Sequence, residues 1–331
     1  MSSALQSILI TGATGFVASH LIPSLDKQGW QITAAIRHNP IQISPNVTPI
    51  DTGDIDGSTN WQRTLNGIDT VIHLAARAHI LSDDTSNPEA EFLKVNTEGT
   101  ANLVKQSIQA GVKHFVFISS VGAMTTLSNQ PLTENFPCQP DTPYGRSKLE
   151  AEQALISLAN QSSMTWTILR PTLVYGPGNP GNMARLIQLI NRGLPLPFGL
   201  VRNRRSFVYI GNLVDAIAIC LTHPNAKNQI FLISDGQDLS TPQLIYKIAH
   251  HLGRSCNFLP VPPSLLKFAG YLGNTVQHLS KRPIPLNTST IDRLLGSLVV
   301  DSNLIQTTLN WQPPYTIDQG LSQMLQPQCH F

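Results

Sequence analysis

The chain has 331 residues, of which 13% are charged, and a formal net charge of +2. This length exceeds what a single hydrophobic core usually fills, so we expect two lobes. The near-neutral balance argues against a nucleic-acid binder or a polybasic membrane protein. Cys138, Cys220, Cys256 and Cys329 lack metal-ligand spacing, and we find neither a signal segment nor a run of ~20 apolar residues. We therefore expect a cytoplasmic protein with reduced cysteines, no metal and no membrane span.

A short apolar strand, a glycine turn and an amphipathic helix come first along the chain. The run 7–10 predicts the buried strand, and the helix follows the glycines. Gly12 permits a tight turn, Gly15 lets the backbone approach a pyrophosphate, and Ala18 allows close packing of the helix on the strand. The free N–H groups at the helix N-terminus favour a bound phosphate. A plain glycine turn is the alternative. The expected cofactor contacts here are Gly12, Thr14, Gly15, Phe16 and Val17.

The second expected strand, 31–36, ends at Arg37. An acidic residue at this position binds the ribose hydroxyls of NAD, whereas an arginine suits the 2′-phosphate of NADP. Arg37 therefore favours NADP, with a solvated arginine beside the adenosine as the alternative. Asp54 and Ile55 end a third strand, where Asp54 could accept a hydrogen bond from the adenine amino group or simply cap the next turn.

A fourth strand, 70–76, runs into Leu74, Ala75 and Ala76, small enough for a dinucleotide to pass closely. Arg77 and His79 follow on the loop, either as substrate contacts or as exposed loop charges. A long helical pattern, 89–110, contains an asparagine at position 96, which is locally unfavourable in a helix. We expect Asn96 to bond a buried backbone carbonyl near the active site, with surface exposure as the alternative.

The fifth buried strand, 115–118, ends in Ser119 and Ser120 at the carboxyl edge of the sheet, where open α/β sheets bind ligands. Further along, Tyr144 and Lys148 stand one turn apart on a predicted helix. A cation within ~4–6 Å favours a phenolate, and lowering the tyrosine pKa by roughly three units needs about 4 kcal/mol. Taken alone, this pair is also a common chance arrangement on a solvated helix face.

The combined motifs resemble the extended short-chain dehydrogenase/reductase family, and within it the nucleotide-sugar epimerases, dehydratases and 4-ketoreductases. The resemblance rests on Thr11-Gly12-x-x-Gly15-x-x-Ala18, His73-Leu74-Ala75-Ala76, Asn96, Ser119-Ser120 and Tyr144-x-x-x-Lys148. It covers nearly the full length, through the segments 167–178, 205–210 and 309–313. The chain departs from the family at Arg37, where an acidic residue is usual, and at Ser206, where the family has aspartate.

The resemblance implies an α/β fold, a Rossmann-type doubly wound parallel sheet with a smaller C-terminal substrate lobe. Residues 1–171 would form the dinucleotide-binding domain, with returning segments around 207–234, and residues 172–331 would mainly form the substrate-binding lobe. Ser120, Tyr144 and Lys148 would be catalytic. The resemblance also places Leu74, Ala75, Ala76, Asn96, Ser119, Tyr144, Lys148, Pro171 and Val174 on the cofactor.

Substrate specificity is expected in the second lobe. A guanidinium fork matches phosphate geometry, so arginines there are candidates for a pyrophosphate. The apolar stretch 265–279 predicts an amphipathic helix packed on this lobe, with interfacial membrane contact as the alternative. The expected substrate contacts are Arg77, His79, Ser120, Asn182, Arg205 and Arg293.

The resemblance and the residues together predict an NAD(P)-dependent oxidoreductase acting at C4 of a UDP-linked hexose. Arg37 favours NADP, whose reduced form suits a reaction that consumes the reductant in every turnover. We therefore favour the reduction of a UDP-4-keto-6-deoxy sugar, N-acetylated, with NADP as the cofactor. The alternatives are a UDP-sugar 4-epimerase, with NAD as the alternative cofactor, and an NADP-dependent reductase of a small non-nucleotide carbonyl. A homodimer through the helices 96–108 and 144–158 is also expected.

Overall fold

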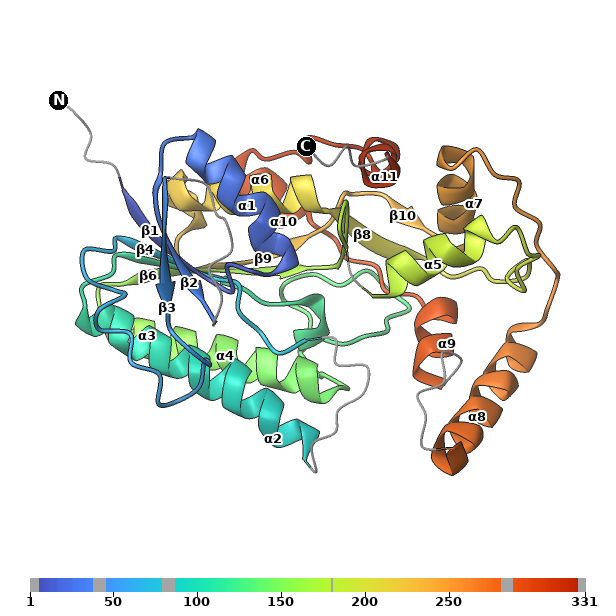
Figure 1. Cartoon of the computed structure of the whole chain (residues 1–331), viewed down its shortest axis with the longest axis horizontal. Helices are drawn as coiled ribbons and strands as arrows, with labels where there is room; N and C mark the ends of the chain where they lie inside the picture. The colour runs from blue at the N-terminus through green and yellow to red at the C-terminus, as the bar shows by residue number, and fades with distance from the viewer. Residues whose placement is uncertain (1–5, 38–45, 79–86, 180, 281–287, 327–331) are drawn as a thin grey trace.

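A parallel sheet with helices on both faces forms the larger lobe of the computed structural model (Figure 1), which describes residues 6–37, 46–78, 87–179, 181–280 and 288–326. Within these residues the sheet has seven strands, in the order β3-β2-β1-β4-β5-β6-β9. The predicted Rossmann-type fold is confirmed. The strands are β1 (Ser7–Thr11), β2 (Gln31–Ile36), β3 (Val47–Asp51), β4 (Thr70–His73), β5 (His114–Ile118), β6 (Thr165–Pro171) and β9 (Gln229–Ile233).

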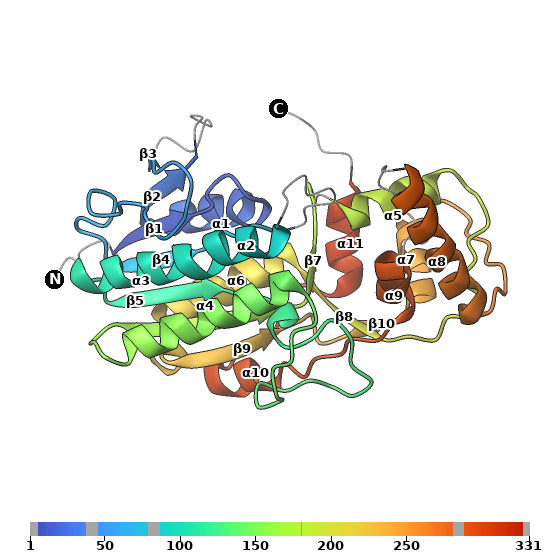
Figure 2. The same cartoon turned by 90° about the horizontal axis from the view of Figure 1, so that it is seen from below.

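Alternate residues of the central strands pack into two separate cores, one on each face of the sheet. On β5, Phe115 and Phe117 join the core beneath α3 (Gly99–Gln109) and α4 (Pro143–Ala159), while Val116 and Ile118 join the core beneath α1 (Phe16–Lys27) and α6 (Ile210–Thr222). The view from below shows α3 and α4 lying side by side across the sheet (Figure 2). Because both faces are covered, the strands are apolar throughout rather than alternating.

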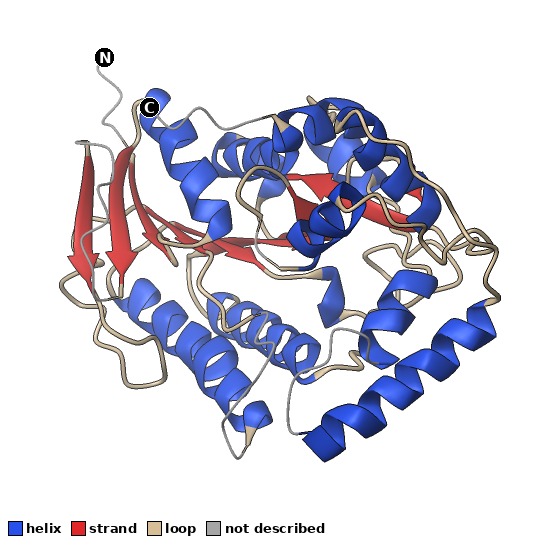
Figure 3. Cartoon of the chain, turned by 45° about the vertical axis from the view of Figure 1, so that its right-hand side comes forward, coloured by secondary structure: helices blue, strands red, loops and turns tan. Residues whose placement is uncertain are grey.

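The smaller lobe leaves the main sheet after Pro171 and is mostly helical (Figure 3). Its three-stranded sheet, in the order β10-β8-β7, contains β7 (Leu173–Tyr175), β8 (Arg205–Tyr209) and β10 (Asp238–Leu239). As predicted, the chain returns to the main sheet with β9, which pairs with β6. The remaining helices are α5 (Asn182–Asn191), α7 (Thr241–His251), α8 (Pro263–Ser280), α9 (Thr288–Leu295), α10 (Asn303–Leu309) and α11 (Ile317–Leu325).

Three predicted elements differ in the structure. The third strand ends at Asp51, so Asp54 and Ile55 lie in the loop beyond it. The fourth strand ends at His73, because Leu74 to Ala76 leave the sheet as a loop. The helix predicted over 89–110 is divided into α2 (Pro88–Phe92), a π-helical turn (Leu93–Glu98) and α3. Single π-turns inside α-helices are frequent at functional sites. No helix in the described part of the chain is long and apolar enough to cross a membrane.

Candidate active site

The glycine turn after β1 is built for close approach of a ligand to the backbone. Gly12 has φ +67°, and a Cβ on it would lie 2.7 Å from the Ala75 nitrogen, so only glycine fits there. The Gly15 N–H donates to the Gly12 carbonyl at 2.9 Å, and α1 begins at Phe16. Thr14 and Gly15 are exposed at this helix N-terminus, while Phe16 and Val17 are half-buried. The turn therefore fits the diphosphate of a dinucleotide.

Asn96 lies in the π-turn, is 1% exposed, and joins the loop after β4 to α4. Its Oδ1 accepts from the Arg77 N–H at 2.7 Å, and its Nδ2 donates to the Arg77 carbonyl at 3.1 Å and to the Ser147 Oγ at 3.0 Å. Asn96 therefore bonds a backbone carbonyl as predicted, although that carbonyl is half-buried rather than buried. The clamp fixes the loop of Ala75 and Ala76 relative to α4.

A buried hydrogen-bonded chain runs from the glycine turn to this clamp, and its direction follows from the donors. The Thr100 hydroxyl donates to the Asn96 carbonyl at 2.6 Å, so the Thr100 oxygen accepts from His73 Nε2–H at 2.9 Å. His73 Nδ1 is then the unprotonated ring nitrogen, and it accepts a hydrogen bond from the Thr11 hydroxyl at 2.6 Å. Burial lowers the His73 pKa to about 3, with the Lys148 charge adding to it, so the ring is neutral.

Ser120 and Tyr144 meet at the carboxyl edge of β5. The Ser120 Oγ accepts from the Gly122 N–H at 3.0 Å, and the Ser120 side chain acts to lower the pKa of Tyr144. A Cβ on Gly145 would lie 2.2 Å from the Gly122 carbonyl oxygen, so glycine at 145 lets the start of α4 reach the serine turn. The sequence reasoning did not identify Gly122 or Gly145. Their positions beside the two catalytic candidates were the available signal.

Lys148 lies one turn beyond Tyr144 on α4, as predicted, and is 1% exposed. Its Nζ donates to the Ile118 carbonyl at 2.7 Å and lies 4.0 Å from the centre of the Phe117 ring. Burial lowers the Lys148 pKa to about 7, and the nearby Glu152 acts in the opposite direction. A lysine that titrates near neutrality inside a sheet edge is typical of an active site.

The expected lowering of the Tyr144 pKa by Lys148 is wrong for this structure. Burial raises the Tyr144 pKa to about 12, and the Ser120 side chain acts in the opposite direction. The Lys148 ammonium is engaged by the Ile118 carbonyl and the Phe117 ring instead. Tyr144 is therefore a protonated phenol that can donate a proton to a substrate oxygen.

A buried ion pair behind the site was missed in the sequence. Glu152 follows Lys148 by one helical turn, and its carboxylate accepts from Arg170 on β6 at 2.5 and 3.0 Å and from the Ser119 hydroxyl. Glu152 is 1% and Arg170 3% exposed. The pair joins α4, β5 and β6 directly beneath the catalytic candidates. The sequence signal for this pair was Glu152 itself, four residues after Lys148 and so on the same helix face. The other acidic residue of this helix, Glu150, is exposed.

The end of β2 carries a charge pair rather than a lone arginine. Arg37 Nη1 donates to the Asp54 carboxylate at 3.1 Å, and both side chains are more than 70% exposed. Ile55 is half-buried beside them. The pairing leaves Asp54 opposite Arg37, so a 2′-phosphate would have to compete with this carboxylate for the guanidinium.

The predicted substrate residues fall into two groups. Arg77 lies over Phe92 at 5.9 Å, and Phe92 makes an edge contact with Tyr144, so Arg77 belongs to the catalytic end. Arg205 on β8 donates to the carbonyls of Arg293 and Gly296 at 3.0 and 3.1 Å. Burial, and then the charge of Arg293, lower the Arg205 pKa to about 10.

The other predicted residues are placed as follows. Pro171 ends β6, and Val174 lies in β7 immediately beyond it. Asn182 is the first residue of α5, at the entrance to the second lobe. His79 lies outside the described residues.

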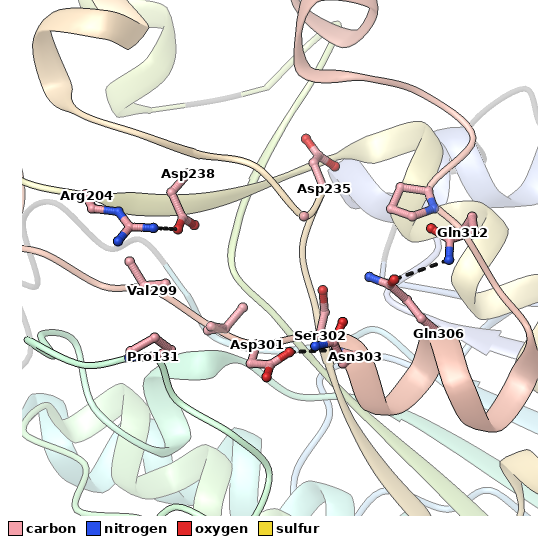
Figure 4. Close-up of a pocket in the computed structure, with 13 residues that line it drawn as sticks. Pro131, Arg204, Asp235, Asp238, Val299, Asp301, Ser302, Asn303, Gln306 and Gln312 are labelled. Atoms are coloured by element: carbon pink, nitrogen blue, oxygen red, sulfur yellow. Dashed lines mark hydrogen bonds and ion pairs between the residues drawn. The ribbon is translucent and has the colours of Figure 1, made fainter.

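A separate cavity of about 510 Å³ opens between β9, β10 and α10 (Figure 4). Asp235, Asp238 and Asp301 contribute carboxylates to the lining of this cavity, but these groups are already bonded to protein groups. Asp238 pairs with Arg204 at 2.9 Å, and Asp301 accepts from the Asn303 N–H at 2.9 Å. None of its lining residues is among the predicted site residues. We therefore place the candidate site by the side chains around Tyr144 rather than by this cavity.

Comparison with known proteins bears directly on this geometry. The model of the "NAD dependent epimerase/dehydratase family" matches residues 8–234. The chain is 42% identical to a UDP-glucose 4-epimerase of Vibrio cholerae over 97% of this chain and 95% of the relative. It is 29% identical to an N-acetyl-alpha-D-glucosaminyl-diphospho-ditrans,octacis-undecaprenol 4-epimerase of Escherichia coli O157:H7, with 97% and 95% covered. The structure of a UDP-glucose 4-epimerase from Thermotoga maritima with UDP-glucose superimposes with a TM-score of 0.75 at 24% identity, covering 96% and 97% of the two chains.

Proposed function

The chain belongs to the NAD dependent epimerase/dehydratase family, and on that premise we propose that it is a 4-epimerase of a UDP-linked hexose. It is an enzyme with a nicotinamide cofactor, as the family description states. The observation that carries the proposal is the cluster of Ser120, Tyr144 and Lys148 at the carboxyl edge of the sheet, joined to the glycine turn through Asn96 and His73. The 42% identity to the Vibrio cholerae epimerase supports C4 as the reacting position.

The proposed chemistry at C4 is a proton transfer coupled to a hydride transfer. The nicotinamide, when bound, accepts and returns the hydride, and in its oxidised form it brings a positive charge. Tyr144 donates its proton to the C4 keto oxygen and recovers it from the C4 hydroxyl, while the Ser120 hydroxyl hydrogen-bonds the same oxygen. A tyrosine pKa of about 12 must fall by roughly five units, or about 7 kcal/mol, for the abstraction to proceed at pH 7. The Ser120 hydroxyl and the positive charge of the oxidised nicotinamide, when bound, would supply part of this stabilisation.

We propose that the cofactor is held by the glycine turn at Gly12 and Gly15, by the 74–76 loop and by Lys148. The choice between NAD and NADP depends on the Arg37–Asp54 pair. Asp54 supports ribose-hydroxyl binding and hence NAD, whereas Arg37 supports a 2′-phosphate and hence NADP. Because the pair already satisfies Arg37, we favour NAD for the epimerase and keep NADP as the alternative.

The substrate diphosphate is proposed to bind beside Arg205 and Arg293. Arg205 is half-buried, and its Nη1 donates to two backbone carbonyls. These bonds fix the plane of the guanidinium and leave its other N–H groups to bind a phosphate. An arginine pair supports a nucleoside diphosphate over a small neutral carbonyl, since a neutral substrate requires no such cations. We therefore set the reductase of small carbonyls aside.

A second candidate is the NADPH-dependent reductase of a UDP-4-keto-6-deoxy sugar. Arg37 is the specific observation in its favour, because it stands where the family usually has an acidic residue. The same Tyr144 proton donation serves both reactions. They differ in whether the hydride returns to the sugar or is consumed.

Product analysis separates the candidates. The purified enzyme is incubated with UDP-glucose, UDP-N-acetylglucosamine and a UDP-4-keto-6-deoxy sugar, each with NAD⁺ or NADPH, and the sugars are identified by NMR. We expect redox-neutral interconversion of C4 epimers without net NADPH consumption. Stoichiometric NADPH oxidation with the keto sugar alone would establish the reductase instead. No turnover of any UDP-sugar, with an intact fold by circular dichroism, would reject both.

Two further proposals concern organisation. We propose the division at residue 171 between the dinucleotide-binding and substrate-binding domains, with the segment around 207–234, which contains α6 and β9, returning to the first. The second proposal is a homodimer through α3 and α4. Ile108 and Leu158 are half-buried on these helices, and a four-helix interface would cover them. A monomer mass in light scattering at micromolar concentration would exclude the dimer. We also propose a cytoplasmic location.

A further inference from the structure

Helix α8 has its apolar face turned outward. Leu265, Phe268 and Leu272 recur at helical spacing and are 57%, 59% and 49% exposed. Among the helix residues whose burial is described, 263–274, the buried ones are Leu266 and Gly270, and a Cβ on Gly270 would lie 3.0 Å from Ile291 of α9. A surface helix ordinarily buries its apolar stripe, so this arrangement is inverted. The predicted helix does pack on the second lobe, through α9, but its exposed stripe takes no part in that packing.

The helix lies at the outer edge of the smaller lobe, where α9 is its main contact (Figures 1 and 2). This position leaves the stripe of Leu265, Phe268 and Leu272, which we call the α8 stripe, directed away from the body of the protein. Three half-exposed side chains offer only a few hundred Å² of apolar surface. A stable protein dimer needs about 800 Å² from each partner, so a second copy of the chain is a poor occupant for the stripe alone.

The charge of the surrounding chain identifies the occupant. From 239 to 291 the sequence has no aspartate or glutamate, although the whole chain has 20 acidic residues. The same stretch has five basic residues, and within its described part the ammonium group of Lys267 stands exposed on α8 itself. The basic residues are Lys247, Arg254, Lys267, Lys281 and Arg282, of which Lys247 is paired with Asp318 of α11 and does not contribute free charge. An apolar stripe in a basic, acid-free segment is complementary to an anionic lipid surface, which combines acyl chains with negative headgroups.

We propose that the α8 stripe docks on the surface of an anionic lipid bilayer. The leucine and phenylalanine side chains enter the headgroup boundary, and Lys267 stays at the level of the phosphates. Nucleic acid is a poorer match, because its backbone offers charge without an apolar layer. The inference does not depend on the substrate of the enzyme, since it concerns a surface outside the candidate site.

The test is flotation of the full-length protein with vesicles of phosphatidylcholine alone or with 30% phosphatidylglycerol. We expect binding only to the anionic vesicles, weakened by salt. Phe268→Ser with Leu272→Ser should reduce binding by about ten-fold or more, because each removed side chain forfeits apolar burial. Leu304→Ser, an exposed leucine on α10, is the matched control and should bind like the wild type.

Two further readouts keep the outcome interpretable. Phe268→Trp keeps an aromatic side chain and should show a blue-shifted emission on anionic vesicles only. Melting curves and sugar turnover of the serine variant should match the wild type, which shows that the fold persists. Absence of binding to anionic vesicles, or equal binding by the serine variant, overturns the proposal. So does self-association in light scattering that disappears in that variant, because the stripe would then be a protein interface.

Discussion

The Glu152–Arg170 pair allows the clearest quantitative test of the site's construction. Replacing Glu152 by Gln removes the carboxylate and leaves the Arg170 guanidinium, 3% exposed, without its counter-charge. Breaking a buried ion pair from one side costs about 3–5 kcal/mol, because the remaining charge is uncompensated. The Ser119 hydroxyl keeps an acceptor in the glutamine, so its hydrogen bond adds little to this cost.

The control is the double variant Glu152→Leu with Arg170→Met. Both charges are then removed together, and the main loss is the unsatisfied Ser119 hydroxyl, worth about 1–3 kcal/mol. The double variant should therefore be more stable than Glu152→Gln alone. Urea unfolding followed by fluorescence and by circular dichroism measures both free energies, and coincident curves justify a two-state treatment.

The single substitution Glu152→Gln should also affect catalysis. Glu152 raises the pKa of Lys148 against the effect of burial, so its removal should move the Lys148 pKa below about 7. Lys148 donates as a protonated amine, and activity that needs this form is lost as the pH rises through its pKa, so the alkaline limb of the pH–rate profile should move to lower pH. The reasoning fails if Glu152→Gln costs less than about 1 kcal/mol, if the double variant is no more stable than Glu152→Gln, or if the pH–rate profile does not move.

Three further predictions follow from the site. Tyr144→Phe should lower turnover by about 10²–10⁴-fold while the Kd for the dinucleotide is unchanged, because only the proton-transferring oxygen is lost; stopped-flow kinetics and calorimetry measure the two quantities, and wild-type turnover would remove Tyr144 from its role. Arg37→Asp should shift the ratio of NAD to NADP affinity toward NAD by at least ten-fold, measured by titration, and an unchanged ratio would exclude Arg37 from cofactor choice. Burial holds the pKa of folded His73 at about 3, against about 6.5 in the unfolded chain. The neutral ring therefore contributes stability above pH 6.5, and this contribution is lost as the pH falls toward 3. Between pH 6.5 and 5 the free energy of unfolding should fall by about 2 kcal/mol. Urea unfolding at pH 7 and pH 5 should show this loss in the wild type and a smaller one in His73→Gln, and equal slopes in the two proteins would contradict it.

The elements of the larger lobe were predictable because buried parallel strands are short apolar runs with turn residues between them. The strand 31–36 and the returning strand 229–233 have the predicted bounds. Tyr144, Lys148 and Asn96 were also predictable as neighbours, because residues at the carboxyl ends of parallel strands and on the adjoining helix converge.

What the sequence did not indicate depends on partners distant along the chain. The pKa of Tyr144 depends on burial and on where Lys148 finds its acceptor, and the Ile118 carbonyl that holds Lys148 is invisible in a sequence motif. The Arg37–Asp54 pair and the Glu152–Arg170 pair each join two elements, so neither residue alone signals the pairing. The outward stripe of α8 was hidden for the same reason, since helical periodicity identifies an apolar face but not the direction it faces.

The return of β9 to the main sheet has a consequence for how the chain is made. One edge of β6 pairs with β5, and its other edge pairs with β9. The residues of β9 are synthesised only after the intervening segment 172–228, which includes this excursion into the smaller lobe. At ~5–20 residues per second, a ribosome needs roughly 3 to 11 seconds to synthesise that excursion. During this interval β6 presents an open edge with apolar residues such as Trp166 and Ile168, which is a template for pairing with another nascent chain. A fragment ending at residue 171 would keep that edge permanently, so the larger lobe should aggregate when it is expressed without the strand that completes it.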